Sequence, residues 1–83
     1  MLSSTELEVQ WARLYLKVGS FDKAKPHIDR ALKEMDPPSA HALEVGYHVA
    51  RGLNDFLLSR AILRQLGNRY PISDEYLRLK DMK

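Results

Sequence analysis

Three side chains near the middle of the chain have the types and the spacing that metal binding requires. His41, Glu44 and His48 would share one face of a helix, because residues three and four positions apart on a helix are neighbours. Imidazole and carboxylate groups are common zinc ligands. No fourth ligand follows at a defined spacing, however, and polar residues on an outward helix face are the commoner reason for such a pattern. We therefore predict no metal site, and we interpret His27, isolated in a charged segment, as a solvated residue.

No other arrangement of residues predicts catalysis. The chain contains no Ser/His/Asp set, glycine-rich phosphate loop or carboxylate pair of recognisable spacing, and it has no cysteine. We predict that the protein is not an enzyme and uses no cofactor. The net charge of +2 is small, and the basic residues are scattered among acidic ones, so we also expect no nucleic-acid partner.

Length and composition indicate one folded domain. Eighty-three residues, 45% of them hydrophobic, are enough for one small core and too few for two. Residues 1–6 lack the basic and apolar regions of a signal peptide, and no apolar run approaches the roughly 18 residues that a membrane span needs. We expect no membrane insertion. The compartment stays open, because the sequence suits the cytoplasm or, within an exported protein, the periplasm.

The apolar residues of the first half recur at helical spacing and predict two helices. The first follows overlapping capping boxes at Ser3-Ser4-Thr5 and ends at Gly19. Its apolar residues cover two adjacent faces, so we expect packing on two sides and place Trp11 in the core. Asp22 is predicted to cap the second helix, which has one narrow apolar stripe and tolerates Pro26 near its start.

The second half predicts two more helices and a short closing one. Ser39 should cap the third helix, and Gly46 in its interior predicts the close approach of another backbone. The fourth helix is expected to end at Gly67-Asn68. Ser73 should cap the last helix, which has acidic residues in its first turn and lysines near its end, as the helix dipole favours. The predicted fold class is therefore all-α.

The two halves repeat one another with a period of 34 residues. Six pairs of positions carry this repeat; five are identical and one exchanges Ala for Gly: Ala12/Gly46, Ile28/Ile62, Arg30/Arg64, Leu32/Leu66, Pro37/Pro71 and Ser39/Ser73. A helix–turn–helix unit of this length buries its apolar face by stacking against its neighbours. We predict one domain, 1–83, with a first repeat at 5–38, a second at 39–72 and a capping helix at 73–83.

These units resemble the tetratricopeptide repeat family over roughly residues 5–72. Residues that match or replace the family's small and apolar positions are Trp11-Ala12, Tyr15, Ala24, Ile28 and Ala31 in the first unit, and Ala42, Val45-Gly46, Val49, Leu58 and Ile62 in the second. Glu8 stands in place of the family's Trp, and Gln65 stands where a small residue is expected. The resemblance implies two stacked repeats in a short right-handed superhelix, closed by the last helix.

In that family, the first helix of each repeat lines a concave groove that holds a peptide or a partner helix. Carried over by position, the groove would present Glu6, Val9, Arg13, Leu16, Lys17, Leu43, Tyr47, Ala50 and Arg51. This mixture of apolar, aromatic and cationic side chains suits a segment with acidic character. Packing between neighbouring helices is the alternative role for Val9, Leu16 and Leu43. One subset of the family holds a C-terminal carboxylate with Lys and Asn, and Val9 and Arg13 at the first two of these positions disfavour that partner.

The resemblance therefore predicts a non-catalytic scaffold or adaptor for a protein or peptide partner. Residues 69–75 are also similar to the ends of bacterial repeat modules in envelope assemblies such as type IV pili and secretion systems. Because such arrays usually have about three repeats, two repeats and a cap suggest an excerpt of a longer array, a self-associating unit or a small adaptor. Two alternative functions stay open: a homo-oligomerisation domain whose groove is buried against a second copy, and an inert spacer between other domains.

Overall fold

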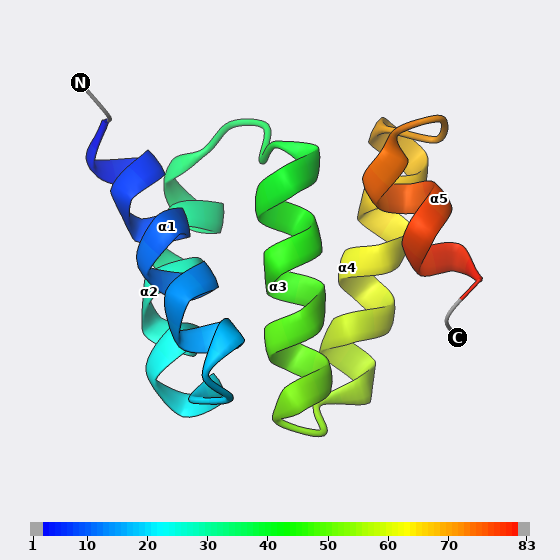
Figure 1. The fold of residues 1–83 in the computed structure, drawn as a ribbon. Helices are drawn as coiled ribbons and strands as arrows, with labels where there is room; N and C mark the ends of the chain where they lie inside the picture. Colours follow the sequence, from blue (N-terminus) through cyan, green and yellow to red (C-terminus); the bar gives the residue numbers. More distant parts are fainter. Residues whose placement is uncertain (1–2, 82–83) are drawn as a thin grey trace.

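The computed structural model describes residues 3–81, and within them the chain forms helices and no strand (Figure 1). The helices are α1 (Ser4–Lys17), α2 (Phe21–Glu34), α3 (Ala40–Gly52), α4 (Phe56–Arg69) and α5 (Asp74–Lys80). Short connections pair α1 with α2 and α3 with α4. The connection between the pairs contains a cis peptide bond, Asp36–Pro37. The predicted all-α fold of packed adjacent helix pairs is confirmed.

Serine side chains begin three of the helices, as the sequence predicts. The hydroxyl groups of Ser3, Ser39 and Ser73 accept hydrogen bonds from the backbone N–H groups of Glu6, Ala42 and Tyr76, respectively, each at 3.1 Å. Each bond satisfies one N–H group that the first turn of a helix leaves without a partner. Gly19, with a φ angle of 78°, ends α1 in the left-handed conformation expected of it.

Two predicted helix ends are wrong. Asp22 does not cap α2, because the helix already begins at Phe21 and Asp22 lies within its first turn. Gly67-Asn68 does not end α4, which continues to Arg69. Gly67 serves packing instead. A Cβ atom at this position would lie 2.7 Å from the ring of Tyr76, so the glycine allows α5 to approach α4.

The helix pairs stack through α2 and α3, and α5 packs against α3 and α4 (Figure 1). The helix α3 is the centre of the fold, and most of its residues are buried. One core cluster joins it to α1 and α2, and a second joins it to α4 and α5. Within residues 3–81, none of the helices has the length and apolar character that a bilayer crossing requires.

Gly46 lies in α3 where the apolar side chains of both pairs meet. A Cβ atom added there would lie 3.1 Å from Leu32 of α2, 3.4 Å from Ile62 of α4 and 3.7 Å from Ile28 of α2. The close approach predicted for this glycine therefore occurs, but side chains make it rather than another backbone. Ile28 and Ile62, one period apart, both lie against this position, Ile28 from the preceding helix pair and Ile62 from the pair that contains Gly46.

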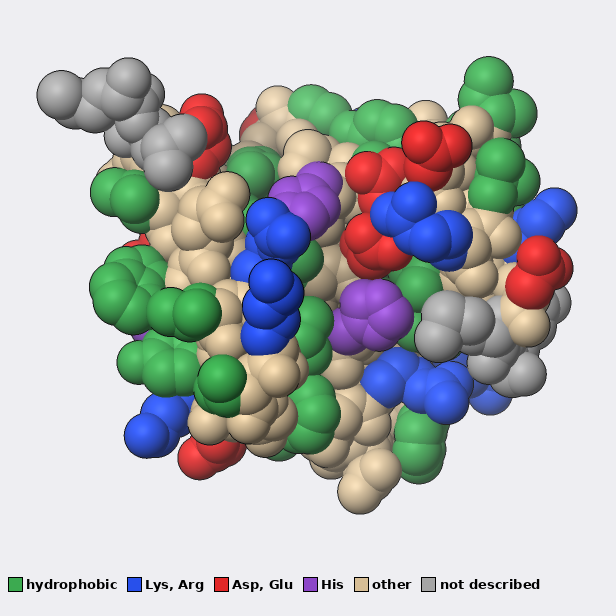
Figure 2. All heavy atoms as spheres, in the orientation of Figure 1, with side chains coloured by type: hydrophobic (Ala, Val, Ile, Leu, Met, Phe, Trp, Pro, Cys, Tyr) green, Lys and Arg blue, Asp and Glu red, His purple; other side chains and the backbone are tan. Residues whose placement is uncertain are grey.

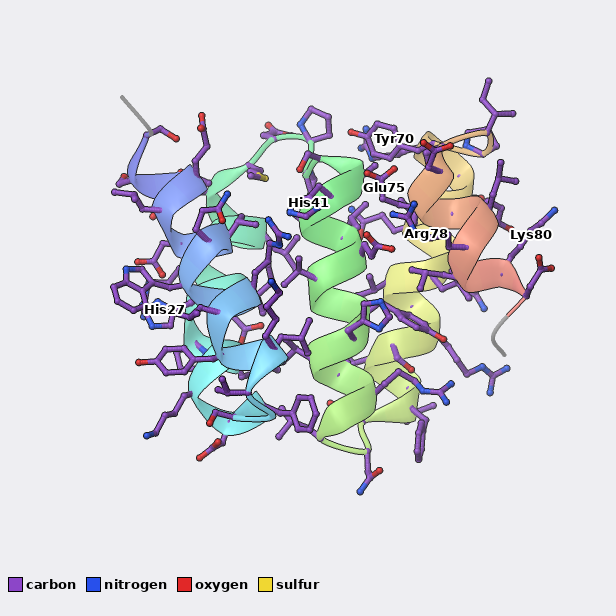
Figure 3. All side chains as sticks on the ribbon, viewed as in Figure 1. His27, His41, Tyr70, Glu75, Arg78 and Lys80 are labelled. Atoms are coloured by element: carbon purple, nitrogen blue, oxygen red, sulfur yellow. The ribbon has the colours of Figure 1, made fainter. Side chains whose placement is uncertain are left out.

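Three contacts fix α5 to the rest of the molecule. Leu79 is buried in the second core cluster. The guanidinium group of Arg78 donates to both carboxylate oxygens of Glu44 on α3, at 3.1 and 3.2 Å from Nη2. Just before α5, the hydroxyl of Tyr70 donates to the backbone carbonyl of Pro38 at 2.7 Å, so it joins the connection that follows α4 to the one that follows α2 (Figure 3).

Candidate protein-interaction surfaces

The residues predicted to line a groove do not form one surface. Val9, Leu43 and Tyr47 are buried, with exposed fractions of 5%, 1% and 3%, and Leu16 packs against the first core cluster. Val9 and Leu43 therefore hold helices together and are not open to a partner. Ala50 is also buried. The exposed members are Glu6, Arg13, Lys17 and Arg51.

The exposed cations lie beside two separate depressions. Arg13 and Lys17 line a shallow depression of about 420 Å³ on α1. Tyr47 and Arg51 line a cleft of about 460 Å³ between α3, α4 and α5, where the buried Tyr47 contributes part of the wall. We call the second the cationic cleft; its residues are Tyr47, Arg51, Phe56, Ser59, Arg60, Leu63, Arg64, Tyr76 and Lys80.

The cationic cleft brings together four positive side chains and no acidic one. Arg51, Arg60, Arg64 and Lys80 are exposed, and none of the four makes an ion pair with another residue of the described chain. The guanidinium carbon of Arg51 lies 5.9 Å from the ring centre of Tyr47 and 5.5 Å from that of Phe56. Cation–π contacts of this kind hold the guanidinium group over aromatic walls. Its Nη1 atom also donates a hydrogen bond to the Tyr47 hydroxyl at 3.4 Å.

The sequence did not single out the α4 wall of the cleft, although it contained a signal for it. Phe56, Arg60 and Arg64 follow one another at intervals of four residues, so they lie on one face of α4. What the sequence could not show is why this face is open. One period earlier, α3 runs from Ala40 to Gly52 and packs against the first pair, whereas α5 is shorter and ends at Lys80, the counterpart of Gly46. The cleft lies beside α5, next to Tyr76 and Lys80.

A second exposed feature runs along α1. Leu7, Trp11, Leu14 and Val18, which we call the α1 strip, are 46%, 48%, 52% and 69% exposed. Figure 2 shows hydrophobic side chains gathered along this outer edge of the molecule, at the left of the view. The depression on α1 lies along the strip, between it and the side chains of Gln10, Arg13 and Lys17.

The placement of Trp11 in the core was therefore wrong. Its counterpart one repeat later, Val45, is 3% exposed because α2 packs on that side of α3. No described helix covers the corresponding side of α1. The apolar pattern correctly showed that α1 has two apolar faces, but only one of them is covered by the described chain.

His27 belongs to a polar cluster and is not solvated as predicted. Its Nδ1 atom lies 2.9 Å from a carboxylate oxygen of Glu8, and the guanidinium group of Arg30 contacts the same oxygen. The imidazole ring also stacks beside Trp11 and Tyr15, with ring centres 6.2 and 5.7 Å apart. The cluster links α1 to α2 at the edge of the α1 strip (Figure 3).

We predict that Glu8 titrates below its ordinary range. The hydrogen bond from His27, assisted by Arg30, lowers the pKa of the Glu8 carboxyl group. Because its folded pKa is depressed, Glu8 stabilises the fold at neutral pH, and this contribution is lost as the pH falls through the folded pKa. A carboxyl titration followed by NMR should give a lowered pKa for Glu8. In the His27→Ala variant the pKa should move back toward its ordinary value, and an unchanged value would assign the shift to another group.

The metal-binding pattern considered in the sequence is rearranged by the fold. His41 and Glu44 of α3 lie beside Glu75 of α5, with their ligand atoms within 4.8 Å of one another, and His48 is not part of this group (Figure 3). Glu44 already makes an ion pair with Arg78 at 3.1 Å. A guanidinium group bound to the central carboxylate opposes a cation there, so we assign the Glu44–Arg78 pair to the packing of α5 on α3.

Comparison with known proteins gives no match: no family model, no curated protein and no solved structure matches this chain. The resemblance to the tetratricopeptide family therefore stays a prediction that depends on the quoted residues and their 34-residue period.

Proposed function

We propose that this chain is a non-catalytic protein-interaction module, of the tetratricopeptide type, that holds an acidic segment of a partner protein in the cationic cleft. The observation that carries the proposal is the gathering of four positive side chains, without an ion-pair partner among residues 3–81, around a cleft with aromatic and aliphatic walls and no acidic residue in its lining. Unpaired cations that converge on one site repel one another, and an anionic ligand removes that repulsion.

The walls of the cleft favour a peptide over a simple anion. Phe56, Leu63 and Tyr76 line it together with the cations. An apolar side chain of the partner would lose its contact with water against these residues, while neighbouring carboxylates accept hydrogen bonds from the arginine side chains. Arginine suits this task because its planar guanidinium group binds a carboxylate through two parallel hydrogen bonds.

The charge around the cleft disfavours a long polyanion such as a nucleic acid. Asp74 and Glu75 occupy the first turn of α5 and Lys80 its last, and Glu44 lies beside the acidic end. Figure 2 shows several acidic side chains over the start of α5, with a basic group among them, and further basic side chains lower on this face. A short acidic segment fits at the basic end alone. A strand that continued along α5 would meet the carboxylates.

The test uses fluorescein-labelled hexapeptides that have Leu, Phe or Tyr near the centre and several Asp or Glu around it. Fluorescence anisotropy should show binding by at least one of them, weakened by added salt because the cations are exposed. The double variant Arg60→Glu/Arg64→Glu should weaken binding by about tenfold or more, since each reversal places a like charge beside the peptide.

A matched control variant is available on the other helix pair, α1 and α2. Lys23 and Lys33 of α2 are exposed, so Lys23→Glu/Lys33→Glu changes the net charge equally without touching the cleft. This control should bind the peptides like the original protein. Failure of every acidic peptide to bind, equal loss in the control, or stronger binding of a single-stranded oligonucleotide of similar charge would each contradict the proposal. If neither the peptides nor the oligonucleotide bound, the result would favour the alternative function of an inert spacer between other domains.

The tetratricopeptide resemblance extends this proposal to a role as scaffold or adaptor. In the bacterial setting suggested by residues 69–75, the partner would be a component of an envelope assembly such as a pilus or secretion system. The proposal identifies that partner by its chemistry, an acidic segment with an apolar anchor.

A further inference from the structure

We propose that the α1 strip is an interface between two copies of this chain, in which the two α1 helices pack antiparallel to one another. This interface is separate from the cationic cleft and goes beyond the binding of an acidic partner. Monomeric soluble proteins rarely expose a contiguous apolar strip of this kind. The four members of the strip are large and 46% to 69% exposed.

The spacing of the strip is that of a two-stranded helical seam. Leu7, Trp11, Leu14 and Val18 follow one another at intervals of four, three and four residues. This is the alternation of the a and d positions of a heptad, which keeps apolar side chains facing a partner helix. The other apolar face of α1, at Val9 and Ala12, is buried against the rest of the chain, so the helix is already folded before it meets a second copy.

The sizes of the side chains favour the antiparallel arrangement. In an antiparallel pair, a and d positions face each other, so Trp11 lies opposite Leu14 of the second copy and Leu7 lies opposite Val18. A parallel pair in register would place the two Trp11 rings against each other. The antiparallel arrangement spreads the side-chain volume evenly along the interface, whereas the parallel arrangement concentrates it at the two tryptophans. Close packing along the whole interface favours the even distribution.

The polar residues beside the strip are compatible with self-association. In the antiparallel pair, Lys17 lies opposite Gln10 of the second copy, and Glu8 lies opposite Tyr15. No like charges meet at these positions. Glu8 also forms an ion pair with Arg30 and contacts His27 within its own chain. A seam of one helix is at the small end of specific interfaces, so we expect a weak dimer, with a Kd on the order of 10 to 100 µM.

The absence of cysteine from the chain makes a direct test available. Two single variants, Leu7→Cys and Val18→Cys, are prepared separately and then oxidised alone or as a mixture. The antiparallel pair places position 7 beside position 18 of the other copy, so the mixture should give a disulfide-linked dimer and each variant alone should give little. A mixture of Val18→Cys with Leu57→Cys, which is 81% exposed on α4, measures random collision.

Each other result overturns the proposal. Efficient cross-linking of each variant alone would indicate a parallel pair, and a mixture no better than the Leu57→Cys control would indicate no pairing through α1. Sedimentation of the unmodified chain should show reversible dimers, and a monomer up to about 500 µM would exclude them. Leu14→Glu should shift the chain to monomer while its circular dichroism stays helical, since Leu14 is 52% exposed.

The two surfaces can be told apart in the same experiments. The cleft variant Arg60→Glu/Arg64→Glu should dimerise like the original protein, because neither residue lies near α1. Trp11 is the only tryptophan of the chain, and its fluorescence should shift to shorter wavelength as the concentration rises, because pairing removes its ring from water. A shift that also appeared with Leu14→Glu would show that the signal does not report this interface.

Discussion

Replacing Ile28 by Ala is expected to lower the free energy of unfolding by about 3 kcal/mol. The Ile28 side chain is 1% exposed and lies in the first core cluster, against the part of α3 where Gly46 has no side chain. Truncation removes buried methyl groups and leaves a cavity that the backbone of α3 cannot fill. Domains of this size have a net stability of roughly 5 to 15 kcal/mol, so the loss is a large part of the total.

Urea unfolding followed by circular dichroism measures this effect, and a second substitution tests whether the two repeats are equivalent. Ile62, one period later, is 6% exposed and meets the same glycine from α4, so Ile62→Ala should cost nearly as much as Ile28→Ala. Leu57→Ala serves as the control, because that side chain is 81% exposed and should change stability by less than about 0.5 kcal/mol. A loss below about 1 kcal/mol for Ile28→Ala would show that this side chain is not in a close-packed core.

Replacing Gly52 by Ala should destabilise the fold by about 2 kcal/mol, although Ala has the higher helix propensity of the two residues. Gly52 is the last residue of α3, and propensity alone would favour Ala by up to about 1 kcal/mol. A Cβ atom at this position would overlap the ring of Phe21, the first residue of α2. Because an aromatic ring is rigid, the two helix pairs would have to move apart to accommodate the methyl group.

A double-mutant cycle isolates this contact. In a Phe21→Ala background the ring is absent, so Gly52→Ala should be neutral or stabilising, and the two changes should be strongly non-additive. Chemical unfolding of the four proteins gives the interaction energy. If Gly52→Ala costs the same with and without Phe21, the penalty arises within α3 and the close contact between the pairs is not its cause.

Much of the fold could be predicted because helix boundaries and periodicity are local properties of the sequence. Ser3, Ser39 and Ser73 begin helices because a hydroxyl group at that position satisfies the first N–H groups, whatever the rest of the molecule does. Gly67 shows the limit of this reasoning. A glycine near a helix end has the same local signature whether it ends the helix or admits a neighbouring ring. The ring of Tyr76 decides between the two, and it comes from another helix.

The candidate interaction surfaces were harder to predict, because a pattern shows which faces of a helix are apolar and not which of them are covered. Trp11 and Val9 both belong to apolar faces of α1, yet Val9 is buried and Trp11 is 48% exposed. The difference depends on whether a helix lies on that side. The cationic cleft likewise depends on the length of α5, which leaves Arg60 and Arg64 uncovered, and the basic residues of α4 look scattered until the helices are assembled.

The attachment of α5 has a consequence for how quickly a ligand could be captured. Tyr70 anchors the residues before the helix to Pro38, and Arg78 clamps its middle to Glu44, so the backbone on this side of the cleft is held in place before any encounter. Association then requires rotamer adjustment of long basic side chains rather than a hinge motion, which belongs to the nanosecond range instead of the millisecond range. Capture should accordingly be limited by diffusion and electrostatic attraction, with a single kinetic phase.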